Sequence, residues 1–261
     1  MNEIITYGQN YSLNKGIKVF VQSAIKTGNK VTVIGCDLKN DVIEYFENNN
    51  VNYVDARAIA TKYNVDLNLS PYTLKVIFFY LYCSKISTSE SVFLCDFTDV
   101  YFQDDIFKDF YKTQGKPTVF HEIELILNCK TNTTWMNLCY GTDIFNLTRG
   151  YEIINGGAIL GHRERCAELL KEMCTDISMI IGRIGNYPNI DQAVLNKVVR
   201  FDYLRYNIFG YDRVANMAYV NVKRAVSIKN NKIIIDNNII PAVVHQYDVN
   251  KDVERFINEQ S

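Results

Sequence analysis

The sequence lacks paired cysteines. It contains seven cysteines in 261 residues, an odd number, and no two of them form a C-x-x-C pair. A disulfide framework or a structural zinc site is therefore not expected, because both need matched sets of cysteines. We expect the thiols to be small buried groups of a protein in a reducing compartment.

Long apolar runs and an excess of one charge are also missing. No apolar run reaches the roughly 20 residues that span a bilayer. The opening residues MNEIITYGQNYS lack a basic region followed by an apolar stretch. The formal net charge is -1, so attraction to nucleic acid or anionic lipid is not expected. We therefore expect a cytoplasmic protein without a transmembrane segment and without a nucleic-acid partner, and its oligomeric state is left open.

Internal repeats, low-complexity linkers and breaks in composition are absent as well. Hydrophobic residues make up 48% of the chain and charged residues 22%, which is ordinary for a folded protein. A chain of this length can form one large domain with a substantial core. We predict a single domain over residues 1–250 and a C-terminal helical tail over residues 251–261.

Strand and helix patterns alternate along the first part of the chain. The strand-like EIITYG precedes a segment in which Ile17, Phe20, Val21 and Ala24 recur at helical spacing. Such alternation predicts an α/β fold with a mainly parallel central sheet flanked by helices. Residues 128–150 are expected to be irregular. The predicted strands are 3–8, 30–37, 51–56, 91–96, 117–124, 151–161, and short strands within 225–236 and 239–248; the predicted helices are 14–28, 41–50, 70–86, 163–181, 189–201 and 253–260.

The segment SVFLCDFTDVYF places two aspartates, Asp96 and Asp99, directly after a strand pattern. Ligands of open parallel sheets collect at the carboxyl ends of the strands. Two nearby carboxylates repel each other unless a positive group lies between them, and a divalent cation fills that role while also binding phosphate oxygens. A turn in which one aspartate caps a helix fits the spacing equally well. The spacing differs from the D-x-D of haloacid dehalogenase-type phosphatases, whose downstream motifs are not recognisable here.

Three further segments place glycine or polar residues at the ends of strands and helices. Gly156 and Gly157 interrupt the strand YEIINGGAILG, which indicates either a β-bulge or a close approach of backbone to a ligand. Asp191 lies at the start of a helix, where capping by Asn189 or Asp191 is the simplest interpretation. His245 ends an apolar run, either as a hydrogen-bonded structural residue or as a ligand of Mn2+ or a similar ion.

The order of these segments resembles that of GT-A glycosyltransferases. The resemblance covers nearly the whole chain: the opening ITYGQNY, the aspartate pair, NGGAILG, DQAVLN and the late histidine. Within that fold the chain is most similar to the glycogenin-like and lipopolysaccharide galactosyltransferase group and to small sugar transferases of large DNA viruses. The resemblance implies a single GT-A (Rossmann-like) domain that uses a UDP-sugar as donor, with Mn2+ (or Mg2+) holding the diphosphate.

The resemblance also implies roles for residues by their position in the motifs. Different residues are implied for contact with the nucleoside, the diphosphate, the donor sugar and the reacting carbon. The implied metal ligands are Asp96, Asp99 and His245; the implied donor-binding residues are Thr6, Tyr7, Asn10, Tyr11, Lys75, Asp96, Asn155, Gly156 and Gly157; the implied catalytic residues are Asp191, Gln192 and Glu122.

The aspartate motif departs from the family pattern, because GT-A enzymes carry D-x-D and this chain has DFTD. Asp99 matches the second aspartate of relatives, since it precedes the alternating VYF. Asp96 either binds the metal directly, binds it through water, or contacts the ribose. Lys75 stands near the place where relatives carry a basic residue, commonly arginine, that faces the diphosphate.

The resemblance further implies a reaction that retains the anomeric configuration, with Asp191 or Gln192 stabilising an oxocarbenium-like sugar. Glu122 in VFHEIE either orients the acceptor hydroxyl or is a surface residue. Trp135 and Tyr140 form either a wall of the acceptor site or a small hydrophobic core. The acceptor is a glycan, a lipid or a protein. A non-catalytic nucleotide-sugar-binding or glycan-binding protein is the alternative function, and a metal phosphohydrolase is a third.

Overall fold

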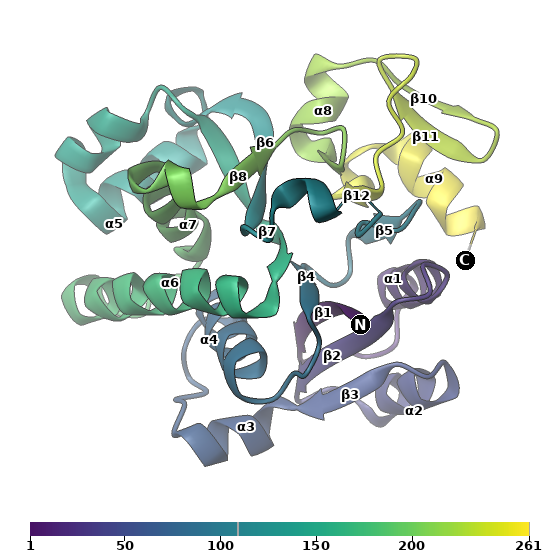
Figure 1. Cartoon of the computed structure of the whole chain (residues 1–261), viewed down its shortest axis with the longest axis horizontal. Coiled ribbons are helices and arrows are strands. Elements are labelled where there is room, and N and C mark those ends of the chain that lie inside the picture. The colour runs from purple at the N-terminus through teal and green to yellow at the C-terminus, as the bar shows by residue number, and fades with distance from the viewer. Residues whose placement is uncertain (109, 261) are drawn as a thin grey trace.

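The computed structural model describes residues 1–108 and 110–260. The strands of its central sheet are β1 (Asn2–Gln9), β2 (Lys30–Cys36), β3 (Asn52–Asp55), β4 (Ser91–Cys95), β6 (Thr118–Leu125), β7 (Glu152–His162) and β8 (Asn207–Phe209). They follow the order β3-β2-β1-β4-β7-β6-β8 (Figure 1). β7 pairs antiparallel with β4 and β6, and the other pairings are parallel. The predicted α/β fold with a mainly parallel sheet is confirmed.

Helices cover both faces of this sheet (Figure 1). One buried cluster joins one face to Leu74 and Phe78 of α4 and Leu169 of α6, and a second joins the other face to Phe20 of α1 and Phe46 of α2. α4 begins at Pro71 with Ser70 as its cap, which is the pattern typical of a helix start. The helices are α1 (Lys15–Ile25), α2 (Asn40–Asn48), α3 (Ala56–Tyr63), α4 (Pro71–Lys85), α5 (Lys130–Thr148), α6 (Arg163–Ile184), α7 (Asp191–Phe201), α8 (Met217–Lys223) and α9 (Lys251–Glu259).

A second sheet, in the order β5-β12-β9, carries a late segment of the chain back to the aspartates. β12 runs antiparallel to β5 and parallel to β9. This pairing sets His245 opposite Val100, the residue after Asp99, and also opposite Asn216. The backbone N–H of Gln246 donates to the carbonyl oxygen of Asp99 at 2.8 Å. The strands are β5 (Val100–Phe102), β9 (Val214–Asn216) and β12 (Val243–His245).

The double glycine lies in a bulged part of β7. Val119 of β6 pairs with Ile159, and His121 pairs with Ile154, so residues 155–158 of β7 oppose only Phe120. Extra residues of this kind kink a strand and redirect its side chains. This register shift fits a β-bulge, one of the two alternatives that the double glycine indicated, and the backbone N–H of Asp96 after β4 donates to the carbonyl oxygen of Gly157.

Residues 128–150 were expected to be irregular, and this prediction is wrong. They form α5, which is interrupted at Gly141, where φ is 77°. The segment is rich in threonine and asparagine, which have low helix propensity, and it shows no clear apolar stripe. Packing of Met136 and Cys139 into the core stabilises the helix instead. Trp135 and Tyr140 pack against this main core and not in a separate small one, and their predicted place in an acceptor wall stays a prediction.

One prediction about a helix start also fails, and one helix was not predicted. α7 has Ile190 at its cap position and no side-chain cap, so neither Asn189 nor Asp191 caps it. The Asp191 side chain is instead held by Lys75, as described below. α3 was not predicted, because its few apolar residues show only one weak turn of helical spacing; Asp55 caps it.

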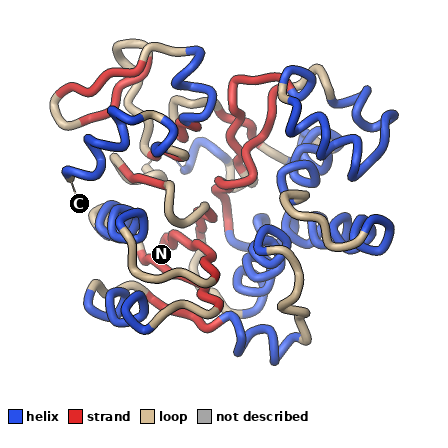
Figure 2. The backbone as a smooth tube through the Cα atoms, turned by 180° about the vertical axis from the view of Figure 1, so that it is seen from behind, coloured by secondary structure: helices blue, strands red, loops and turns tan. Residues whose placement is uncertain are grey.

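The elements of the C-terminal part of the chain lie together at one side of the molecule (Figure 2), and their apolar side chains share a buried cluster with Val19 of α1. β10 (Val226–Lys229) and β11 (Lys232–Ile235) make an antiparallel hairpin, which confirms the short strands predicted within residues 225–236. α9 buries Val253, Phe256 and Ile257 in this cluster. The division into a domain and a tail at residue 250 stays a prediction.

All seven cysteines are free. Over residues 1–108 and 110–260, no helix combines the length and the apolar character needed to cross a bilayer.

Candidate active site

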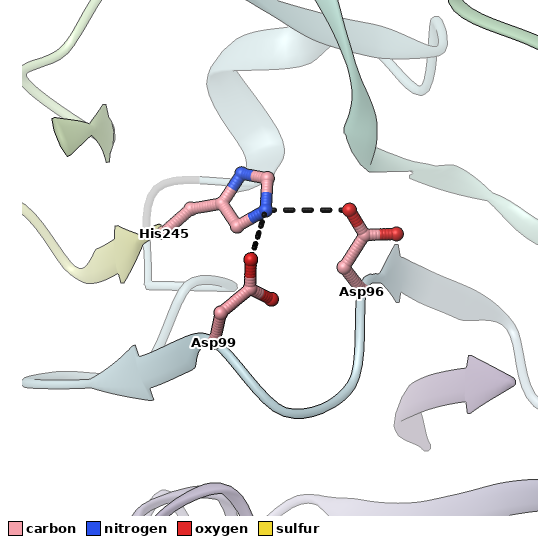
Figure 3. Close-up of side chains that lie close together, drawn as sticks. All are labelled: Asp96, Asp99 and His245. Atoms are coloured by element: carbon pink, nitrogen blue, oxygen red, sulfur yellow. Dashed lines mark ion pairs between the residues drawn. The ribbon is translucent and has the colours of Figure 1, made fainter. Parts of the chain in front are cut away.

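Residues 96–99 form a short loop between β4 and β5, at the carboxyl end of the central sheet. The ring of Phe97 is 3% exposed and anchors the loop in the core. The carbonyl of Thr98 packs so closely on Gly16 of α1 that a Cβ at residue 16 would collide with it. Phe97 and Thr98 therefore fix the loop against the core, and the side chains of Asp96 and Asp99 both point toward His245 (Figure 3).

Asp96, Asp99 and His245 converge on one point (Figure 3). The Nε2 atom of His245 lies 3.3 Å from Oδ2 of Asp96 and 3.5 Å from Oδ2 of Asp99. One possible ligand atom from each residue lies within 4.8 Å of the others. His245 is 1% exposed, while both aspartates are half-buried. The three predicted metal ligands are therefore side by side.

The charged groups of this cluster shift one another's pKa values strongly. Burial would lower the pKa of His245, but the carboxylates of Asp99 and Asp96 raise that pKa to about 10. Burial would raise the pKa of Asp96, but Lys75 and His245 hold it far below its usual value. Neither ring nitrogen of His245 makes a hydrogen bond within the described residues, since the contacts to the aspartates lack the right geometry.

Gly157 keeps the space between these side chains open. A Cβ at residue 157 would collide with Oδ2 of Asp96 and would lie 2.5 Å from Cε1 of His245. The carbonyl of Gly157 also accepts from the backbone N–H of Asp96 at 3.1 Å. Two carboxylates, an imidazole without hydrogen bonds and a glycine-lined space fit a divalent cation such as Mn2+ or Mg2+.

Lys75 is a buried cation that joins the cluster to α7. Its Nζ donates to Oδ1 of Asp96 at 2.8 Å, lies 3.0 Å from Oδ2 of Asp191, and is 3.4 Å from the carbonyl oxygen of Gly156. Burial would lower the pKa of Lys75, but Asp191 and Asp96 raise it well above its usual value. Lys75 is therefore a permanent positive charge between two acids.

Glu122 lies beneath the bulge of β7. Its Oε1 accepts from Nδ2 of Asn155 at 2.6 Å and from Nδ2 of Asn216 at 3.1 Å. Asn155 in turn accepts from the backbone N–H of Gly157 at 2.7 Å. Glu122 is 4% exposed, so the alternative of a surface residue is wrong, and its predicted role toward the acceptor hydroxyl stays a prediction. Burial raises the pKa of Glu122 to about 7.

Replacing Glu122 by glutamine is expected to flatten the pH dependence of the free energy of unfolding. Between pH 4.5 and about 7 the folded state keeps the Glu122 proton while the unfolded state has lost it, so wild-type stability falls as pH rises. The shift is worth about 3 kcal/mol. Chemical denaturation of wild type and E122Q from pH 4 to 8 tests this, because other titrating groups cancel in the difference. Parallel profiles would contradict the prediction.

Gln192 is held from two sides. Its Oε1 accepts from the backbone N–H of Gly156 at 3.0 Å, and its Nε2 donates to Oδ1 of Asn132 at 3.0 Å. Asn132 belongs to α5, so the helix that the sequence did not predict fixes the orientation of a predicted catalytic side chain. Asp191, beside it, is 4% exposed and faces Lys75.

A cleft of about 440 Å³ opens beside the cluster of Asp96, Asp99 and His245. Its volume suits a nucleotide-sized ligand. Of the predicted donor-binding residues, Tyr7, Asn10, Tyr11, Lys75 and Asp96 line this cleft. Several other lining residues were not predicted from the sequence, among them an exposed aromatic ring and an acid close to His245 in sequence; these are Gln9, Pro71, Tyr72, Phe97, Thr98 and Asp248.

Thr6 is not among the residues that line the cleft, and its predicted contact with the nucleoside stays a prediction. Its side chain is fully buried, because adjacent residues of a strand face opposite sides and Tyr7 takes the side of the cleft. Tyr72 and Asp248 gave no recognisable signal in the sequence, although Tyr72 follows the helix start at Pro71. Asn155, Gly156 and Gly157 adjoin the cleft through Lys75 and Asp96.

Comparison with solved structures finds the same architecture elsewhere. The chain superimposes on the galactosyltransferase LgtC in complex with donor and acceptor sugar analogues with a TM-score of 0.61 and 15% identity, over 100% of this chain and 96% of that one. The chain has the GT-A glycosyltransferase fold. An active-site mutant of LgtC gives a TM-score of 0.60 at 15% identity, over 98% of this chain and 94% of that one. No protein-family model and no curated protein matches the sequence. Within the GT-A fold, the acidic cluster lies at the carboxyl end of the parallel strands, where such sheets bind ligands.

Proposed function

We propose that this protein is a metal-dependent glycosyltransferase that moves a hexose from a UDP-sugar to a glycan acceptor with retention of configuration. The observation that carries the proposal is the convergence of Asp96, Asp99 and His245 beside a nucleotide-sized cleft. The GT-A fold and the neighbour solved with donor and acceptor sugar analogues support the same class of reaction.

In this proposal the cleft binds the nucleoside of the donor, and the cluster of Asp96, Asp99 and His245 binds its diphosphate through a cation. Tyr7 and Tyr11 offer aromatic surface to the nucleoside, and Asn10 offers polar groups at the end of β1. The diphosphate would meet the cation held by Asp96, Asp99 and His245. That cation, when bound, neutralises the charge that grows on the leaving diphosphate.

The reacting carbon would lie toward α7. The bond from the sugar carbon to the phosphate oxygen breaks, and its electron pair goes to the UDP that leaves. Asp191 and the Oε1 of Gln192 then stabilise the cationic sugar. The acceptor hydroxyl attacks from the same face and gives its proton to the departing phosphate oxygen, which balances the step and retains the configuration. Lys75 holds the Asp191 carboxylate in position for this role.

A panel of nucleotide sugars tests the proposal. A UDP-sugar with Mn2+ is expected to raise the Tm, because a ligand at 100 times its Kd stabilises the folded state by about 2.7 kcal/mol. Asp99→Asn is expected to lose the part of the shift that needs Mn2+. Slow release of UDP from the same UDP-sugar would show turnover.

Other results of these assays would indicate a different function. Binding without release of UDP, even with an added glycan, would indicate a non-catalytic nucleotide-sugar-binding protein. Release of inorganic phosphate would indicate a phosphohydrolase. No shift with any UDP-sugar would remove the support for the proposed donor.

A further inference from the structure

Two buried polar atoms beside the cluster have no hydrogen-bond partner among the described residues. They are Nδ1 of His245 and Oδ1 of Asn216. His245 is 1% exposed and Asn216 is 2% exposed, so water does not reach either atom freely. A buried polar atom without a partner costs about 1–3 kcal/mol, and such atoms are rare in native folds. One of the two is a donor when protonated and the other is an acceptor.

The strand pairing makes these two residues neighbours. His245 of β12 is in register with Asn216 of β9. Residues in register on adjacent strands present their side chains on the same face of the sheet. Nε2 of His245 faces the two aspartates, so Nδ1 lies on the far edge of the ring (Figure 3). The edge that a cation would not use is therefore the edge left for a partner such as Asn216.

Glu122 determines which end of the Asn216 amide is available. The amide Nδ2 donates to Oε1 of Glu122, which also accepts from Asn155. Above its pKa of about 7, Glu122 is ionised and can only accept, so the NH2 of Asn216 faces Glu122. Its carbonyl oxygen is then directed away from Glu122, which is the orientation needed to accept from an imidazole N–H.

We propose that Asn216 is a positioning residue for His245: when a divalent cation binds Nε2, the Nδ1–H of His245 donates to Oδ1 of Asn216. This inference rests on the proposed function, because it assumes that the cluster binds a cation. A hydrogen bond of this kind fixes the tautomer and the ring orientation of a metal-bound histidine. Glu122 contributes one step further away, by holding the Asn216 amide.

Binding of Mn2+ alone to the full chain, titrated by calorimetry at pH 8, tests the inference without measuring turnover. Loss of a histidine's hydrogen-bond partner weakens metal binding about 10-fold to 100-fold, so Asn216→Ala is expected to raise the Kd for Mn2+ by that factor. Gln103→Ala is the matched control. Gln103 is also buried and bonds to Ile233 and Pro241 near the same small sheet, without contact to the cluster. The Kd of the Q103A variant for Mn2+ is expected to stay within about threefold of that of wild type.

His245→Ala separates failure of this inference from failure of the proposed metal site. The inference predicts that H245A loses Mn2+ binding, that N216A weakens it and that Q103A does not. If H245A loses binding while N216A matches Q103A, the inference is overturned and the metal site stands. If H245A binds Mn2+ as wild type does, or wild type does not bind, both are overturned.

A measurement on the wild-type protein guards against an N216A variant that does not fold. The chain has three histidines, so their side-chain 15N–1H signals can be assigned. In protein loaded with Zn2+, a diamagnetic substitute, the Nδ1–H of His245 is expected to give a downfield signal that exchanges slowly with water. Exchange as fast as that of an exposed imidazole would overturn the inference.

Discussion

Gly157→Ala is expected to abolish both Mn2+ binding and turnover while the protein stays folded. The added Cβ would collide with Oδ2 of Asp96 and lie 2.5 Å from Cε1 of His245, so two of the three candidate ligands would have to move. A displacement of about 1 Å among reacting groups already costs about 100-fold in rate, and here two ligands are pushed apart at once. UDP release with saturating Mn2+, together with calorimetric Mn2+ titration, measures the loss.

The neighbouring glycine supplies the control for this variant. A Cβ at Gly156 would lie 3.4 Å from Oδ2 of Asp191 and from atoms of Gln192, which is ordinary contact distance. Gly156→Ala is therefore expected to keep Mn2+ binding, with its effect confined to the sugar side of the site. Equal loss of Mn2+ binding in G156A and G157A would show that the bulge as a whole, and not the space beside Asp96, is what matters.

Lys75→Met is expected to produce the largest loss of stability of any single change at the site. The variant leaves Asp96 and the buried Asp191 without their shared cation. Removing one partner of a buried ion pair costs about 3–5 kcal/mol. Turnover is expected to fall because Asp191 loses its orientation, yet Mn2+ binding is expected to hold or tighten, since Asp96 no longer shares its charge. Denaturation with and without Mn2+ measures both effects.

Lys75→Arg is the matched variant, because it keeps the positive charge between the two acids. It is expected to fold with a stability closer to wild type than K75M has. Mn2+ is expected to raise the Tm of K75M by more than it raises that of wild type, because the cation replaces part of the missing charge. A K75M protein that binds Mn2+ more weakly than wild type would contradict this view of Lys75.

The alternation of strand and helix predicted the central sheet, because its strands and the helices that cover them each show the spacing of apolar residues typical of their type. The grouping of Asp96 and Asp99 followed from their place after β4. The approach of His245 could be inferred only from the family resemblance, since no local pattern relates residue 245 to the loop at residues 96–99. The link is made by the pairing of β12 with β5, a contact between segments far apart in sequence.

The parts that were missed depend on tertiary contacts. α5 has weak helix propensity and is stabilised by packing, so no window of sequence predicts it. Asn132 and Asn216 are single asparagines whose roles depend on side-chain contacts, of Asn132 with Gln192 and Cys129 and of Asn216 with Glu122. The pairing of Lys75 with Asp191 joins two helices, and a sequence shows neither the burial nor the direction of either side chain.

The small β5-β12-β9 sheet has a consequence for how the protein matures. His245 is synthesised long after the two aspartates, and the hydroxyl of Tyr247 reaches the carbonyl of Thr98 across 149 positions of sequence. Contacts of such long range form late and slowly in folding. A nascent chain that has completed its large sheet would still lack His245 beside the two aspartates. The three candidate metal ligands would come together only when β12 docks beside the loop at residues 96–99. A bound cation would then act as a reversible crosslink between the two distant segments.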